Sequence, residues 1–275
     1  MEIELKKQID VLEREITLKS VDLDEDIDDF SIDIHNYKDN EKLITISSRC
    51  VRCNLCVEEC PINVISSATW LKRAKIGEDC VQCEICAQTC PVSCIYVWDA
   101  EAEIDKDDSV KYNLKEVKVP HRTLKMEDIS IDREICIGCG SCLKYCPTNA
   151  ISLRDKAYIE AHGELCPETG AIDSEDGHMF SYIDKNRCCA CGSCANLCIQ
   201  GAISLKRNLG PVVIYSHINV DQDTCVGCGL CEDNCPVEAI KVEDGMVNLS
   251  HDKCIRCNEC SSRCPVGALS LEMDK

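Results

Sequence analysis

Short stretches in which apolar and polar residues alternate recur along the chain. Clear examples are residues 129–132 (ISID), 218–221 (INVD) and 247–250 (VNLS). Successive side chains of a strand point to opposite faces, so strict alternation predicts a β-strand with one buried face. Each of these stretches lies a few residues before a dense run of cysteines. The pattern therefore predicts that a strand leads into such a run.

A second apolar signal follows the cysteine runs. Proline follows the last cysteine of a run in five places, and Ile199 takes that position once. A few residues later come a small residue and then an aliphatic one, at 64–65, 94–95, 150–151, 202–203, 239–240 and 268–269. Proline disfavours helical geometry in the residue before it. We therefore expect a repeated unit of strand, cysteine loop, short helix ended at the proline, and second strand.

The cysteine runs are copies of one motif, C-x-x-C-x-x-C-x-x-x-C. Its six copies occupy residues 50–60, 80–90, 136–146, 188–198, 225–235 and 254–264. Although 27 of the 275 residues are cysteine, chance does not produce this spacing six times. Self-similarity at this level is the mark of a repeat protein.

The spacing has a chemical reason. Thiolates three residues apart on a tight loop can converge on one inorganic core, and glycines at 138, 140, 192, 227 and 229 permit the backbone angles that such a loop demands. We expect the fourth cysteine to lie on the following helix and to point away from its own loop. It is then free to reach a neighbouring core.

These runs carry a family resemblance. Residues 136–152 (CIGCGSCLKYCPTNAIS) and 225–241 (CVGCGLCEDNCPVEAIK) resemble bacterial two-cluster ferredoxins, in which the fourth thiol ligates the other cluster. Over residues 43–275 the chain resembles a polyferredoxin, like the arrays attached to methanogen hydrogenases and formylmethanofuran dehydrogenase. The resemblance implies an α+β fold of three tandem 2[4Fe–4S] ferredoxin-like domains, with short antiparallel strands and short helices around paired clusters. It implies six [4Fe–4S] clusters.

The ligand sets follow from this resemblance once the motifs are paired. First cysteines lie 30 residues apart in copies one and two, 52 in copies three and four, and 29 in copies five and six, which favours consecutive pairing. Nested pairing, with one ferredoxin inserted in another, stays open as the alternative. The expected sets are Cys50, Cys53, Cys56 with Cys90; Cys80, Cys83, Cys86 with Cys60; Cys136, Cys139, Cys142 with Cys198; Cys188, Cys191, Cys194 with Cys146; Cys225, Cys228, Cys231 with Cys264; and Cys254, Cys257, Cys260 with Cys235.

Composition divides the chain into five parts. We expect an acidic extension at 1–40, a ferredoxin domain at 41–99, a charged linker at 100–125, a second domain with an insertion at 126–206, and a third domain at 207–275. The region around the linker contains one expected strand, Tyr112–Val119. In the extension, Leu5, Ile9, Leu12 and Ile16 fall on one helical face. That face either packs on the first domain or binds a partner.

Three cysteines fall outside the ligand sets. Cys94 stands where other copies have Ala or Val, which predicts a small buried side chain. Cys189 is one residue out of phase and is expected to be a spare thiol, with exchange for a neighbouring ligand as the alternative. Cys166 begins CPETGAI, an echo of the repeat tail, and is either a structural thiol or a ligand or remnant of a motif.

The net charge and the length of the apolar runs limit the kinds of partner and location expected for the chain. The 49 acids and 30 bases give a formal net charge of −19, which argues against nucleic acid and suits basic patches on redox enzyme subunits. No apolar run approaches the roughly 18 residues of a membrane span, although a membrane-bound complex stays compatible. The charged N-terminus predicts no signal peptide and therefore a reducing cytoplasm. An odd cysteine count also argues against a disulfide scaffold.

An electron relay is the function that these features predict. Zinc sites usually join two C-x-x-C knuckles across a longer spacer, which differs from four cysteines within eleven residues. An iron–sulfur storage or scaffold protein is the alternative, and the sequence has no motif for catalysis. We expect apolar neighbours of the clusters to exclude water, namely Ile62, Val92, Ile137, Leu143, Val226 and Leu230.

Overall fold

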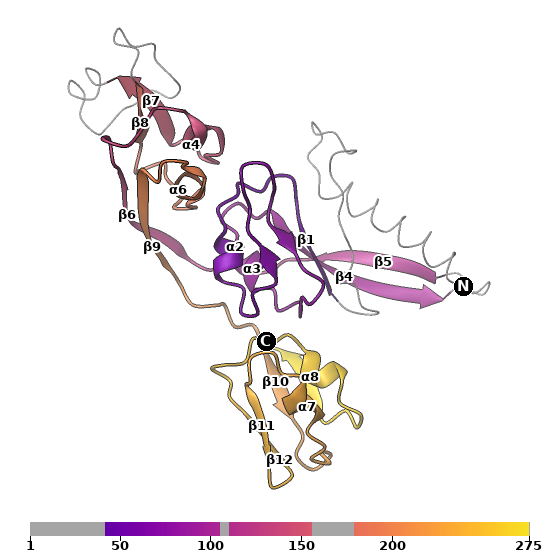
Figure 1. Ribbon diagram of the computed structural model, residues 1–275. Coiled ribbons are helices and arrows are strands. Elements are labelled where there is room, and N and C mark those ends of the chain that lie inside the picture. Colours follow the sequence, from indigo (N-terminus) through magenta and orange to yellow (C-terminus); the bar gives the residue numbers. More distant parts are fainter. Residues whose placement is uncertain (1–41, 105–109, 156–178, 275) are drawn as a thin grey trace.

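The computed structural model describes residues 42–104, 110–155 and 179–274, which form three similar units (Figure 1). The apolar stripe expected within residues 1–40 and the thiol of Cys166 lie outside the described residues.

The first unit contains two strand pairs and two short helices. Its elements are β1 (Lys42–Ile46), α2 (Leu55–Glu58), β2 (Ile65–Ser66), β3 (Lys75–Ile76), α3 (Ile85–Thr89) and β4 (Ile95–Ile104). The outer strands pair antiparallel, from Lys42 opposite Asp99 to Ile46 opposite Ile95. The inner strands β2 and β3 also pair antiparallel. The two cysteine motifs of the unit are therefore related by an approximate twofold.

The same order recurs twice. The second unit comprises β6 (Leu124–Ile131), α4 (Ser141–Lys144), β7 (Ile151–Asp155), β8 (Met179–Ile183), α6 (Ser193–Leu197) and β9 (Ile203–Leu209). The third comprises β10 (Ser216–Val220), α7 (Leu230–Asp233), β11 (Ile240–Glu243), β12 (Met246–Leu249), α8 (Glu259–Ser262) and β13 (Leu269–Met273). In both, the outer strands pair with each other and the inner strands with each other. Strand pairing thus groups the motifs consecutively along the chain.

The alternating stretches form strands as expected, and one region contains more structure than the sequence indicated. β4 continues to Ile104 and pairs with β5 (Val110–Val117), from Val97 opposite Val117 to Ile104 opposite Val110. The single strand expected in the linker is therefore the second arm of a hairpin that extends the first sheet. In β5, residues 110–115 alternate apolar and polar, with Val110, Tyr112 and Leu114 two apart, as a strand requires.

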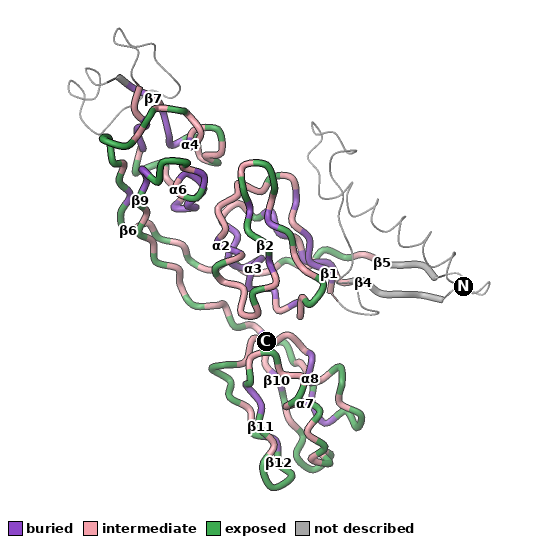
Figure 2. The backbone as a smooth tube through the Cα atoms, viewed as in Figure 1, coloured by how far each residue is buried: buried purple, intermediate pink, exposed green. Residues whose placement is uncertain are grey.

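Each unit has its own core, and cysteines are part of all three. Cys56, Cys86 and Cys90 pack with Ile44 and Val97 in the first unit. Comparable clusters surround the cysteines of the second and third units. The buried segments lie along the strands and helices of each unit, and the turns between them are exposed (Figure 2). Cysteine side chains therefore make up part of each small core, alongside few aromatic side chains.

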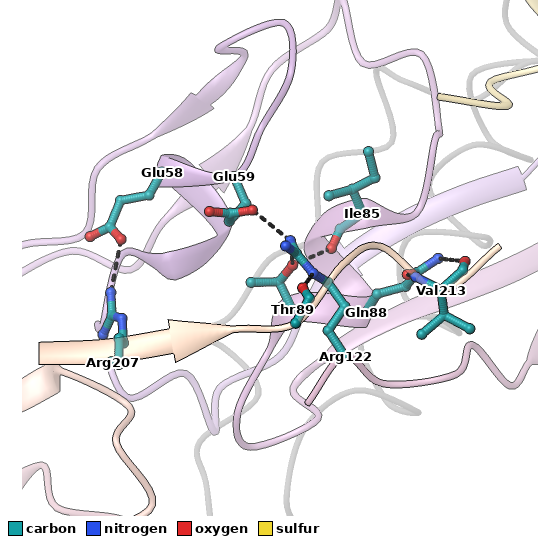
Figure 3. A network of polar contacts seen from close by, with 9 residues as sticks. Glu58, Glu59, Ile85, Gln88, Thr89, Arg122, Arg207 and Val213 are labelled. Atoms are coloured by element: carbon teal, nitrogen blue, oxygen red, sulfur yellow. Dashed lines mark hydrogen bonds and ion pairs between the residues drawn. The ribbon is translucent and has the colours of Figure 1, made fainter. Parts of the chain in front are cut away.

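The first unit lies between the other two because both chain connections are fastened to it (Figures 1 and 3). Arg122, just before β6, donates from Nη1 to Glu59 at 2.5 Å and to Thr89 at 3.3 Å. Its Nε donates to the carbonyl of Gly210, just after β9, at 2.8 Å. One guanidinium therefore ties the segments leading into and out of the second unit to helices α2 and α3.

The connection to the third unit is held by a second clamp on α3. The side-chain amide of Gln88 donates to the carbonyl of Val213 at 3.2 Å and accepts from the Val213 N–H at 2.9 Å (Figure 3). Gln88 is only 4% exposed, so this paired bond is largely shielded from water. The clamp fixes where the third unit begins relative to the first.

Candidate metal centres

All six cysteine loops share one unusual backbone conformation. The residues two and four positions after the first cysteine have positive φ in every copy, as does the residue three positions after the fourth cysteine. The five glycines singled out in the sequence occupy such positions, and other copies place Arg52, Gln82 or Glu84 there. A non-glycine residue in this region costs roughly 1–2 kcal/mol. The conformation is thus kept in all copies, including those without glycine.

Two glycines are needed for space as well as for φ. A β-carbon on Gly138 would lie 2.0 Å from the carbonyl oxygen of Met179, and one on Gly227 would lie 2.8 Å from Cα of Gly245. In both cases the cysteine loop packs against the backbone of a neighbouring hairpin. These contacts hold the loop in place from outside.

The small residue after each motif also has a clear role. In five copies the N–H four residues after the fourth cysteine donates to the sulfur of that cysteine, at 3.1–3.3 Å. The donors are Cys94, Ala150, Ala202, Ala239 and Ala268, each at most 4% exposed. A larger side chain would hold the backbone away from the sulfur. The small–aliphatic signature is therefore a hydrogen-bonding signature.

Four cavities lie between the cysteines, and each is lined by thiols from both motifs of its unit. One is lined by Cys225, Cys228, Cys231 and Cys264, and one by Cys136, Cys139, Cys142 and Cys198. The other two are lined by Cys50, Cys53, Cys56 and Cys90 and by Cys146, Cys188, Cys191 and Cys194. All four cavities therefore have the same kind of lining, three thiols of one motif and the fourth thiol of its partner motif.

Thiols of the remaining two sets share the cores of the first and third units. Cys60 packs against the core cluster that contains Cys86, and Cys235 and Cys254 pack against the cluster that contains Cys260. Burial raises the pKa of Cys86 well above its usual range, and the nearby Cys83, Cys80, Cys56 and Cys60 raise it further. Thiols of one motif therefore share a core with the fourth thiol of its partner motif.

Several of the buried thiols need a cation to stay ionised. Burial raises the pKa of Cys53, Cys83, Cys194 and Cys260 to about 12, because a thiolate is poorly solvated there. A thiolate is the form that binds metal. The sites therefore lose protons when a metal core binds, and core binding and folding are linked.

The arrangement of the thiols bears on the kind of metal centre. A structural zinc holds its four thiolates about 2.3 Å from one ion. In the part of the chain that the structure describes, no three cysteine, histidine or acidic side chains are arranged to hold a single metal ion. All-cysteine sets with N–H bonds to sulfur are the usual ligation of [4Fe–4S] clusters.

Two cavities contain a fifth thiol. Cys94 is 3% exposed, as expected for a small buried residue, but its sulfur lies 3.4 Å from that of Cys90. This contact lowers the pKa of Cys50 to about 6 and that of Cys90 to about 7, since Cys94 is a hydrogen-bond partner of both. Cys189 lines the cavity of Cys188 and Cys191, and its bond to Cys191 lowers the pKa of Cys189 to about 6.

Two expectations about the surroundings of the cysteines are wrong. In the described units, all six helices end before the fourth cysteine, and Cys90 and Cys198 have extended backbone angles. In five copies the proline after this cysteine disfavours helix at it. The apolar shield is also incomplete, since Ile137 is 51%, Val226 64% and Leu230 42% exposed. Ile62, Val92 and Leu143 are half-buried, as a shield requires.

Fold and cysteine geometry together define an iron–sulfur protein of the ferredoxin type. The 4Fe-4S dicluster domain matches residues 218–271 and 187–239, and the 4Fe-4S binding domain matches 43–66 and 129–152. The match at 187–239 joins motifs four and five, whereas strand pairing joins three with four and five with six. The long insertion between motifs three and four makes motif five the nearer neighbour of motif four in sequence.

Comparison with known proteins identifies relatives of this chain among ferredoxins and polyferredoxins. The chain is 30% identical to ferredoxin-3 of Rhodobacter capsulatus over 26% of this chain and 71% of that protein. It is 52% identical to a polyferredoxin-like protein of Methanocaldococcus jannaschii over 40% of this chain and 44% of the relative. It is 41% identical to one subunit of the H2:CoB-CoM heterodisulfide,ferredoxin reductase of Methanothermobacter marburgensis, over 26% of this chain and 10% of that relative.

The chain belongs to the 4Fe-4S ferredoxin family and is a polyferredoxin with multiple dicluster domains. The matched segment spans less than half of the Methanocaldococcus protein. In the part of the chain that the structure describes, no helix has the length and apolar character needed to cross a bilayer.

Proposed function

We propose that the chain carries six [4Fe–4S] clusters and relays single electrons between subunits of redox enzymes. The observation that carries the proposal is the set of four cavities, each lined by three thiols of one motif and one of its partner. The packing of cysteines of the other two sets into the same cores supports extending this arrangement to six. In each proposed ligand set, the first three cysteines of a motif combine with the fourth cysteine of the consecutive motif, which gives three domains.

The residues of the chain would do three things for such a relay. Thiolates hold each core from four directions, so little rearrangement accompanies a change in its charge. Backbone N–H groups donate to the sulfurs and stabilise the more negative state, which sets the reduction potential. When bound, the clusters supply reversible one-electron chemistry.

Partners are proposed from charge and from the relatives. Each oxidised cluster with four thiolates carries −2, so six would take the formal charge from −19 to about −31. Such a field favours a basic patch on the partner and makes association sensitive to salt. The likeness to part of a reductase supports a role beside an oxidoreductase. On the family resemblance, we propose a hydrogenase or formylmethanofuran dehydrogenase complex as the partner. The chain would be its non-catalytic electron-transfer subunit.

Iron and sulfide analysis of anaerobically purified protein, with reductive EPR titration, tests the proposal. About 24 irons per chain and about six reducible spins are expected, which follows from four irons in each cluster. Iron that is substoichiometric and readily passed to an apoprotein would instead indicate a scaffold. Protein loaded with zinc would refute both functions.

A further inference from the structure

The six cysteine loops differ sharply in exposure. Cys139 and Cys228 are the exposed cysteines among those described, and the other middle cysteines of the loops are buried or half-buried. The residue two positions before each of them repeats the difference: Ile137 and Val226 are exposed, whereas Val51, Val81 and Ile255 are half-buried. Two loops therefore face solvent, and four are covered.

Two of the covered loops, one from the first unit and one from the second, lie against each other. Ser193, between two cysteines of the second unit, donates from Oγ to the carbonyl of Val51, between two cysteines of the first. Next to this bond, the Asn196 side chain donates to the carbonyl of Arg52 at 2.8 Å. Trp70 reinforces the junction by donating from Nε1 to the carbonyl of Leu197 at 3.0 Å. The loops at 50–56 and 188–194 thus lie face to face.

The other pair of covered loops joins the first unit to the third. In the first-unit loop at 80–86, Gln82 and Glu84 are 7% and 3% exposed. In the third-unit loop at 254–260, Glu259 is 7% exposed and Oδ1 of Asn258 is buried. The Gln88–Val213 clamp fixes the chain connection beside this junction (Figure 3).

We infer that electrons cross the three units in the spatial order second, first, third, and that they enter and leave through the two exposed loops, 136–142 and 225–231. This inference rests on the proposed relay function and specifies its route. The first unit, which contains the first two cysteine motifs of the chain, lies in the middle of the route. Each end of the route is a loop that no other described unit covers.

Both ends have the surface that a redox protein needs for close docking. At one end, Ile137, which lines the same cavity as Cys139, is 51% exposed, and Ile199, next to Cys198 of that cavity, is 65% exposed. At the other, Val226 and Val266 are 64% and 40% exposed beside Cys228. An apolar rim around a cofactor edge lets a partner expel water and shorten the distance that the electron crosses. The apolar side chains that failed as a shield are therefore suited to contact.

Charge selects the kind of partner at the third unit. Residues 221–249 contain seven acids and one lysine, and that lysine pairs with Glu232. The hairpin turn at Asp244 and Gly245 packs against the Cys225–Cys228 loop, so part of this charge lies at the docking edge. We assign this end to a one-electron redox protein with a basic surface around its cofactor.

Reduction of cytochrome c, a basic one-electron acceptor, tests the assignment on the full-length holoprotein. The protein is first reduced with dithionite under anaerobic conditions and freed of excess reductant. One electron then leaves a reduced cluster, which becomes oxidised, and ferric haem becomes ferrous without proton transfer. We expect Asp233→Lys/Asp244→Lys to lower the second-order rate constant about tenfold at low ionic strength and to lose this effect in high salt.

Glu78→Lys/Asp79→Lys is the matched control, because it changes the net charge by the same amount. Both residues are exposed and directly precede a cysteine loop, but that loop is one of the covered ones. We expect the rate constant to change less than twofold, as the net charge alone would require. An equal loss in both proteins would overturn the inference, because electrons would then leave at a covered loop as readily as at an exposed one.

Carbodiimide cross-linking to cytochrome c gives a readout that does not depend on turnover. Cross-linked peptides from 221–249, with fewer from the segment around Glu134 before Cys136, are expected. Cross-links centred on Glu58 or Asp79 would overturn the route even where iron analysis finds all six clusters. Low iron content would instead overturn the proposed function, so the two failures are distinguishable.

Discussion

Replacing Cys94 by alanine tests whether hydrogen bonds to the ligand thiols set the cluster potentials. The Cys94 sulfur lies 3.4 Å from that of Cys90, and its N–H donates to the same atom at 3.3 Å. Cys94→Ala removes the thiol donor and keeps the backbone donor. Four other copies have alanine at this position, so the substitution suits the fold.

The expected shift follows from the strength of one weak donor. A typical hydrogen bond contributes about 0.5–1.5 kcal/mol net, and a thiol lies at the low end. For a one-electron couple, about 1.4 kcal/mol corresponds to about 59 mV. A difference of about 0.5–1 kcal/mol between oxidation states therefore lowers the potential of this cluster by about 20–40 mV. The sign is negative because the lost donor favoured the reduced, more negative state.

EPR-monitored redox titration of the anaerobic holoprotein measures the shift. One of the clusters should titrate at lower potential in Cys94→Ala, with the iron content unchanged. Ala239→Cys is the reciprocal variant, because the Ala239 N–H donates to Cys235 at 3.1 Å in the third unit, and it should raise a different potential. An unchanged titration in both variants, or a rise in Cys94→Ala, would refute the hydrogen-bond reasoning.

Three further predictions concern the fold and the junctions. Gly138→Ala should destabilise the second unit by about 3 kcal/mol, because the added β-carbon would meet a backbone oxygen; faster cluster loss in denaturant measures this. Gly140→Ala, where only a side-chain methyl lies near, should cost about 1 kcal/mol, and equal losses in both variants would contradict the steric argument. Chelating the iron should abolish the cooperative melt, since cysteines are part of each core; a folded apo form by circular dichroism would refute this. Arg122→Ala should loosen the second and third units from the first and increase the radius of gyration measured by small-angle scattering. Arg133 is exposed, so Arg133→Ala should leave the radius unchanged, and equal radii for the two variants would argue against the clamp.

Cysteine spacing predicted the local architecture because ligation is a short-range property. The motif indicated loops, short helices and flanking strands, and the structure has them in all three units. The sequence showed that the residue four positions after the fourth cysteine is small. The reason, an N–H bond from that residue to the sulfur, depends on backbone directions that spacing does not reveal. Left-handed positions without glycine, such as Gln82, were missed because their side chains carry no conformational signature.

The sequence by itself determined that this is a repeat of cysteine loops built to bind metal clusters, since each set of thiols is encoded within one or two neighbouring motifs. Only the tertiary structure decided how the units are arranged. That order depends on contacts such as Arg122 with Glu59 and Ser193 with Val51, between residues 63 and 142 positions apart. Single polar side chains make these contacts, and nothing periodic marks them. The first unit therefore occupies the centre, although it comes first in the chain.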